Sequence, residues 1–189
     1  MKLLLITLTV LQSLFATLEQ KTLQSDFTIT VADSQSPMSD SQPMTYSGTL
    51  AMHGKRFALE MFGMEAAYDG NTLYMYSEEL EELTLSTPTE EELTQTNPFL
   101  YAQALLPICQ YAEKVVGDKT QITLTPNDQS AGIKKFVLRV TTATLLPTNI
   151  EIHETEVQTT TLRLSNARYT DETPSFVIEK EGAFVNDLR

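Results

Sequence analysis

Apolar and polar residues alternate with a period of two through most of this chain, and this alternation limits its fold more than any other feature. Phe27, Ile29 and Val31 alternate with Thr28 and Thr30, as in a half-buried strand, where successive side chains point to opposite faces of a sheet. We count about 10 to 11 strands joined by short turns. Besides 27–31, the strand-like segments are 46–52, 57–61, 64–68, 72–77, 82–85, 122–124, 136–140, 150–152, 157–164 and 176–178.

The short turns favour antiparallel pairing of consecutive strands, and the polar segment 33–43 predicts a hairpin loop. A sheet with this many strands curls, because each strand twists against its neighbour. We therefore predict a mainly β fold, an incomplete antiparallel β-barrel formed by a strongly curved sheet of about 10 to 11 strands with a helical lid or plug. Its apolar face encloses either a core of the protein's own side chains or a cavity for a ligand. The periodicity leaves both alternatives open.

Residues 88–117 interrupt the alternation. Thr89, followed by three glutamates, is typical of a capped helix start with acidic residues in its first turn. Asn97 precedes a proline that begins a second helix, and Pro107 ends or kinks that helix. We expect residues 111–116 to add a further helical turn. These helices are the candidates for a lid over the curved sheet.

The N-terminus fits two interpretations. Lys2 followed by the apolar run 3–11 is typical of a secretory signal, with cleavage near Ala16. The run is too short and too interrupted for a membrane-spanning helix. Under this interpretation residues 1–16 are a signal peptide, and residues 17–189 form a single domain.

The same region also has the pattern of an amphipathic helix. Leu11, Leu14 and Leu18 recur at helical spacing, with polar residues between them. Residues 1–16 then form the start of the first helix. The two interpretations are compatible if a signal region continues into that helix.

Charge and cysteine content exclude several classes of function. The formal net charge is −12 and the 13 Lys and Arg residues are dispersed, so we expect no nucleic-acid partner, because phosphate binding needs clustered cations. Cys109 is the only cysteine, which excludes an intrachain disulfide and a cysteine-based zinc site. Its apolar neighbours predict a buried, unreactive thiol.

No pattern of catalytic or metal-binding residues stands out. The two histidines, His53 and His153, lie far apart, and the chain has no phosphate loop, nucleophile elbow or dinucleotide fingerprint. The acidic runs 78–82 and 90–92 lack the oxygen spacing of a calcium loop, and a solvated turn and a helix start explain them better. We therefore expect no enzyme, no cofactor and no metal site.

The segments YDGNTLYMY at 68–76 and TNPF at 96–99 occur together with four other segments. In this order they resemble the LolA family of periplasmic lipoprotein carriers. Residues 68–76, YDGNTLYMY, resemble the family's DG-x-x-L-W-x-Y hairpin, with Tyr74 in place of the tryptophan. The sequence TNPF at 96–99 is similar to the family's proline-started helix. The other matching segments are 23–27, 47–50, 55–57 and 184–189, the last being similar to the terminal strand of Bacteroidetes-type members.

The resemblance implies an incomplete β-barrel with a helical lid over a hydrophobic cavity, and a monomeric carrier or chaperone in the periplasm. Such a carrier accepts the acyl chains of a lipoprotein from an inner-membrane ABC transporter and passes them to an outer-membrane receptor. A carrier is needed because each CH₂ group exposed to water costs about 0.8 kcal/mol. The alternative within this fold is a sensor module that binds lipids or lipoproteins without shuttling them.

Under this interpretation the apolar strand residues line the cavity and the second helix is the lid. The family's lid-locking arginine falls at Gly54 by position, which leaves Arg56 as either a substitute or an exposed turn cation. The expected cavity residues are Leu50, Met52, Phe57, Leu59, Met61, Leu73, Met75, Leu83 and Leu85, and the expected lid residues are Phe99, Leu100 and Leu105.

Overall fold

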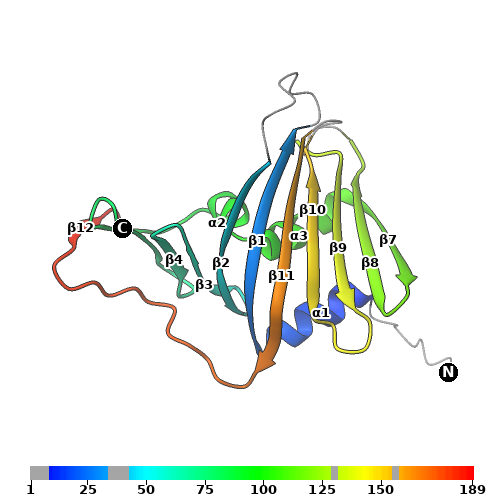
Figure 1. The fold of residues 1–189 in the computed structure, drawn as a ribbon, viewed down its shortest axis with the longest axis horizontal. Helices are drawn as coiled ribbons and strands as arrows, with labels where there is room; N and C mark the ends of the chain where they lie inside the picture. The colour runs from blue at the N-terminus through cyan, green and yellow to red at the C-terminus, as the bar shows by residue number, and fades with distance from the viewer. Residues whose placement is uncertain (1–8, 34–42, 129–131, 155–157) are drawn as a thin grey trace.

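The described part of the chain folds into one open sheet of twelve strands with three α-helices and a short 3₁₀ helix (Figure 1). The structure is a computed structural model and describes residues 9–33, 43–128, 132–154 and 158–189, so the predicted loop at 33–43 falls almost wholly outside it. The helices are α1 (Val10–Leu18), α2 (Glu90–Thr96), α3 (Pro98–Leu105) and η1 (Leu106–Ile108). The strands are β1 (Thr22–Asp33), β2 (Met44–His53), β3 (Arg56–Met61), β4 (Met64–Tyr68), β5 (Leu73–Ser77), β6 (Glu82–Ser86), β7 (Cys109–Val116), β8 (Lys119–Pro126), β9 (Lys135–Thr141), β10 (Pro147–His153), β11 (Gln158–Thr170) and β12 (Phe184–Asp187).

The strand order is β12-β6-β5-β4-β3-β2-β1-β11-β10-β9-β8-β7. Strand β1 pairs with β2 on one side and with β11 on the other, so it joins two runs of consecutive hairpins at the centre of the sheet. Among the described strands, only β12 and β6 pair in parallel. The sheet does not close, because β12 and β7 form separate edges. The predicted class, a mainly β and incomplete barrel-like sheet with helices, is confirmed.

Two predicted elements are wrong. Residues 111–116 are not a helical turn but most of β7, which forms a hairpin with β8. The turn of this hairpin contains Gly117 at φ +63°, which glycine adopts without strain. Residues 176–178 form no strand, although Phe176 is only 4% exposed. Phe176 and Ile178 of this segment pack against the sheet, although the segment pairs with no strand. The apolar pattern alone cannot distinguish such a segment from a strand.

The two helices predicted after residue 88 are confirmed. In α2 the Thr89 hydroxyl accepts a hydrogen bond from the Glu92 amide at 3.2 Å, and the Glu92 carboxylate accepts one from the Thr89 amide at 2.7 Å. These reciprocal bonds form a capping box, which satisfies two amides that a helix start otherwise leaves unpaired. Helix α3 begins at Pro98 and ends at Leu105, directly before the 3₁₀ turn that contains Pro107.

The N-terminal region is helical from residue 10. Helix α1 has its own capping box, made by Thr9 and Gln12, and buries Leu11, Leu14 and Leu18. The amphipathic pattern is therefore confirmed as a helix. The removal of residues 1–16 stays a prediction, and cleavage near Ala16 would take away most of this helix.

One face of the sheet, here called the inner face, carries the main core. All three α-helices lie on that side, behind the strands in Figure 1. The helices and inner-face strand residues form one apolar cluster, because alternate side chains of each strand point toward the helices. Its largest fully buried members are Phe57, Phe99, Phe136, Leu11, Leu14, Leu18, Leu23, Met52, Ile122, Leu124, Leu138 and Ile150.

The opposite, outer face carries a second and smaller cluster near the β6 edge, with Ala67, Tyr74, Leu83 and Leu85 at its centre. After β11 the chain runs outside the sheet toward β12 (Figure 1), and Ile178 from this segment packs on the cluster. Here the Lys180 ammonium pairs with the Glu65 carboxylate at 2.5 Å. The C-terminal segment therefore covers an apolar patch that the helices do not reach.

Candidate functional site

A cavity of about 650 Å³ lies between the inner face and helices α2 and α3. This volume falls within the range of small-molecule sites, roughly 300–1,000 Å³. Its apolar lining residues are Phe27, Ile29, Leu50, Leu59, Met61, Pro98, Ile133, Ile150, Ile152 and Leu162. Its other described lining residues are Glu91, Thr94, Gln95, Thr96, Tyr101, Glu154 and Thr160.

The strand register separates this cavity from a packed region on the same face. Leu23, Met52 and Phe57 lie opposite one another on β1, β2 and β3 and are fully buried. The C-terminus of α1 lies beside this row, because the Leu18 carbonyl accepts a hydrogen bond from the Gly54 amide at 2.7 Å. We call this region, with α1 against it, the packed end.

The next residues along the same strands line the cavity. Leu50 lies opposite Leu59, and Met61 lies opposite Gly48. A Cβ atom at Gly48 would lie 2.7 Å from the Phe27 ring, so the missing side chain leaves room for that ring on the cavity wall. We call the region of the cavity lining, with α2 over it, the hollow end.

Helix α2 covers the cavity but does not fill it. Of its seven residues, all described, only Leu93 is buried. Glu91, Thr94 and Gln95 line the cavity instead, and their polar side chains cannot replace the apolar contacts that a packed core provides. The hollow therefore follows from the sequence of this helix.

Helix α3 contributes the Tyr101 ring to the cavity wall. This ring packs edge-on against Phe136 with ring centroids 6.2 Å apart, a favoured geometry for aromatic pairs. Burial raises the pKa of the Tyr101 hydroxyl, and the nearby Cys109 and Glu154 raise it further. The hydroxyl is therefore protonated at neutral pH, so it is a potential hydrogen-bond donor at this wall.

Three of the expected cavity residues, Leu50, Leu59 and Met61, do line the cavity. Met52 and Phe57 lie on the inner face but belong to the packed end, where they are fully buried. Leu73, Phe99, Leu100 and Leu105 also belong to the packed core cluster and do not line the cavity. The three expected lid residues of α3 therefore lie in the packed core.

The expected positions of three further residues need correction. Leu83 and Leu85 lie on the outer face, opposite Tyr76 and Tyr74 of β5, and pack beneath the C-terminal segment. Alternation gives the spacing of a strand's apolar residues but not the face to which they point. Met75 shares a face with Leu73 but lies near the sheet edge and is 42% exposed.

Several residues of the cavity are not among those expected from the sequence. Ile29 and Leu162 lie opposite each other on β1 and β11, and Ile150 continues the row on β10. Their alternation was visible in the sequence. Their place beside Leu50 and Leu59 depends on the pairing of β1 with β11, which are far apart in the chain and carry no local pairing signal.

Arg56 contacts the C-terminal segment after β11. Its guanidinium carbon lies 5.3 Å from the centre of the Phe176 ring, so it stacks on the C-terminal segment. This cation–π contact favours the attachment of that segment to the sheet. This contact matches neither interpretation of Arg56, as a substitute for the lid-locking arginine or as an exposed turn cation.

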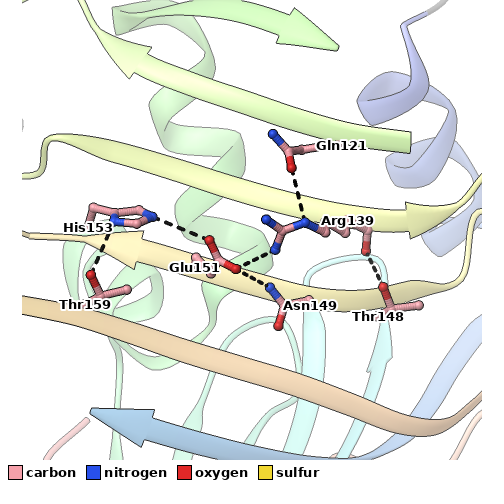
Figure 2. A network of polar contacts seen from close by, with 7 residues as sticks. All are labelled: Gln121, Arg139, Thr148, Asn149, Glu151, His153 and Thr159. Atoms are coloured by element: carbon pink, nitrogen blue, oxygen red, sulfur yellow. Dashed lines mark hydrogen bonds and ion pairs between the residues drawn. The ribbon is translucent and has the colours of Figure 1, made fainter. Parts of the chain in front are cut away.

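A polar network crosses the outer face behind the hollow end (Figure 2). The Arg139 guanidinium donates to Glu151 at 2.5 Å and to Gln121 at 3.2 Å, and Asn149 donates to the same Glu151 oxygen at 3.0 Å. Despite partial burial, which acts to raise it, the pKa of Glu151 is lowered by Arg139, Asn149 and His153. The carboxylate is therefore ionised at neutral pH and joins β10 to Arg139 of β9, and Arg139 in turn joins β9 to Gln121 of β8.

His153 lies at one end of this network. Its Nδ1 atom lies 3.2 Å from the Thr159 hydroxyl, and its Nε2 atom lies 3.5 Å from Glu151 (Figure 2). The strand alternation places these residues on the face opposite Ile150 and Ile152, so they do not reach the cavity. We interpret the network as structural.

Three further observations concern the Cys109 thiol, metal-binding clusters and membrane-spanning helices among the described residues. Burial raises the pKa of the Cys109 thiol, so the thiol is protonated at neutral pH. Within residues 9–33, 43–128, 132–154 and 158–189, no cluster of three or more His, Cys, Asp or Glu side chains could hold a metal ion. No helix in these same ranges is long and apolar enough to span a membrane.

The family described as outer membrane lipoprotein carrier protein LolA matches residues 19–176. The chain belongs to the LolA family. The matched range contains the sheet from β1 to β11 and both helices at the cavity, so the resemblance noted in the sequence is confirmed. A search of curated proteins finds no match.

Several solved structures are similar to this LolA-family chain. An uncharacterized conserved protein from Thermus thermophilus has a TM-score of 0.60 at 12% identity, with 95% of this chain and 99% of that chain covered. A LolA superfamily protein from Nitrosomonas europaea has a TM-score of 0.42 at 12% identity, covering 88% and 96%. A putative outer membrane lipoprotein-sorting protein domain from Vibrio parahaemolyticus has a TM-score of 0.42 at 11% identity, covering 85% and 90%. At 12% identity, the similarity to the Thermus thermophilus protein shows the fold alone.

Proposed function

We propose that this protein is a periplasmic carrier that binds the acyl chains of lipoproteins in the cavity under α2 and carries them from the inner to the outer membrane. One observation carries the proposal, namely that the inner face is packed under α1 but hollow and apolar under α2. Membership of a carrier family agrees with it. An enzymatic function has no comparable support.

The cavity has the properties that acyl-chain binding requires. Each CH₂ group moved from water onto this apolar wall gains about 0.8 kcal/mol. Met61 adds a flexible, polarizable side chain to the wall, which suits chains of varied shape. The binding free energy therefore comes mainly from the number of methylene groups enclosed.

Release requires a cover that opens at little cost. Helix α2 is short and has one buried apolar residue, Leu93, and short helices gain most of their stability from such packing. We therefore propose that α2 is the movable lid, while α3 stays packed in the core. The partners would be an inner-membrane ABC transporter that supplies the lipoprotein and an outer-membrane receptor that accepts it.

A single substitution can test whether the cavity is the binding site. Thr94→Phe places a ring on the lid side of the cavity, and we expect it to weaken binding of a fluorescent fatty-acyl probe at least tenfold. Because the ring fills empty space, the urea midpoint should stay equal or rise. Thr125→Phe is the matched control, since it adds the same ring at an exposed position on β8. Equal probe binding by both variants, or no binding by the unmodified protein, would contradict the proposal.

A second experiment separates a carrier from a sensor of the same fold. The protein is depleted from cells, and membranes are fractionated. Accumulation of lipoproteins in the inner membrane is expected for a carrier. Normal lipoprotein distribution, with acyl chains still found on the purified protein by mass spectrometry, would favour the sensor.

A further inference from the structure

We infer that the cavity favours acyl chains attached to a cationic or uncharged peptide and disfavours those attached to an anionic one, an inference that rests on the proposed carrier function. The described lining contains two carboxylates, Glu91 and Glu154, and no Lys, Arg or His. An anionic group beside the bound chains thus meets carboxylates without a basic partner from these residues.

The two carboxylates come from different parts of the cavity. Glu91 lies in the first turn of α2, on the lid, and is exposed. Glu154 follows β10 directly and is half-buried, with its Oε1 atom accepting a hydrogen bond from the Thr160 hydroxyl at 3.3 Å. Thr160 itself lines the cavity. A group held between the lid and the sheet therefore has negative charge on both sides.

The charge of Glu154 acts on the cavity wall. It contributes, after burial and Cys109, to the raised pKa of the Tyr101 hydroxyl. That hydroxyl belongs to the wall. A second anion placed in the same space would be opposed in the same way, and a cation would be attracted.

The size of this effect can be estimated from Coulomb's law. For a unit charge about 6 Å from a carboxylate, with an effective dielectric constant between protein surface and water, the change in affinity is roughly tenfold. The effect should shrink at high salt, because the lid side is open to solvent. The apolar contacts should be the same for every head group, so the chains set the affinity and the carboxylates set the preference.

The test uses three labelled probes that share one triacylated cysteine. In the first the cysteine is followed by Ser-Lys-Lys-Lys-Lys, in the second by Ser-Gln-Gln-Gln-Gln, and in the third by Ser-Glu-Glu-Glu-Glu. Binding to the full chain is measured by fluorescence anisotropy below the aggregation concentration of each probe. We expect the glutamate probe to bind about tenfold more weakly than the glutamine probe, and the lysine probe to bind at least as tightly as the glutamine probe.

Two double variants separate the cavity carboxylates from the overall charge. Glu91→Gln with Glu154→Gln should remove most of the difference between the probes. Glu79→Gln with Glu181→Gln changes the net charge equally but at exposed positions outside the cavity lining, so the difference should persist. A difference that disappears equally in both variants would assign it to net charge and overturn the inference.

The remaining outcomes distinguish the two proposals. If all three probes bind with equal affinity, the charge preference is wrong and the carrier function stands. If none of them binds and Thr94→Phe changes nothing, the cavity is not an acyl site and the proposed function fails with it. Binding of the glutamate probe most tightly would also overturn the charge preference.

Discussion

The packed end and the hollow end share one sheet face but are covered by different helices. Helix α1 buries three leucines, Leu11, Leu14 and Leu18, in nine residues. Helix α2 buries Leu93 alone in seven. The strands beneath both helices are similarly apolar, so the covering helix decides whether the space between is filled. The cavity is thus specified by the lack of apolar side chains on the side of α2 that faces it.

The largest expected effect is on the free energy of unfolding, when a leucine is replaced by alanine at each of the two ends. Leu18→Ala removes a fully buried side chain under α1 and should lower the free energy of unfolding by about 3 kcal/mol. Leu59→Ala, at the half-buried cavity wall, should cost about 1 kcal/mol, since the atoms removed already border empty space. Urea unfolding measures both values. Equal costs would mean that the two ends are packed alike, which would break the comparison.

The sequence predicts the wall of the cavity where pairing is local. Leu50, Leu59 and Met61 belong to the β2–β3 hairpin, whose tight turn at Gly54 sets the register directly. The capped starts of α2 and α3 were equally readable, because capping depends on a few neighbouring residues. For these elements, sequence and structure agree.

The sequence does not predict the position of a side chain when that position depends on the pairing of distant strands or on the geometry of a turn. Leu83 and Leu85 point to the outer face and not to the expected inner face, because the turn before β6, with Glu81 at φ +49°, decides the side to which the strand's residues point. Ile29 and Leu162 join the cavity through a pairing between opposite ends of the chain. The periodicity that identified each strand contains neither piece of information.

The polar network around Glu151 supports the hollow end from the outer face. Strand β10 borders the cavity through Ile150 and Ile152, so the network around Glu151 should matter more there. Glu151→Gln should lower the free energy of unfolding at pH 7 by about 1.5 kcal/mol, because it weakens a partly buried, charge-assisted bond to Arg139. Glu172→Gln, at an exposed carboxylate, is the control and should change little.

The pH dependence of this effect has a definite sign. The folded-state pKa of Glu151 is lowered from its ordinary value of 4.5. Its stabilising contribution is therefore complete above that value and is lost as the pH falls through the lowered pKa. The difference between Glu151→Gln and the unmodified protein should shrink toward acidic pH. A difference that stays constant between pH 7 and pH 3 would assign the loss to packing.

The smallest expected effect is on the rate of acyl-probe association, and it shows which helix is the lid. Thr89→Ala removes the N-cap of α2 and should cost about 1 kcal/mol of helix stability. If α2 opens to admit ligand, this cost raises the open population about fivefold, and acyl-probe association should accelerate by a similar factor. Thr9→Ala removes the matching N-cap of α1, at similar cost. Because α1 covers the packed end, probe association should not change. Acceleration by Thr9→Ala, or none by Thr89→Ala, would place the moving cover elsewhere and leave α2 as a fixed wall.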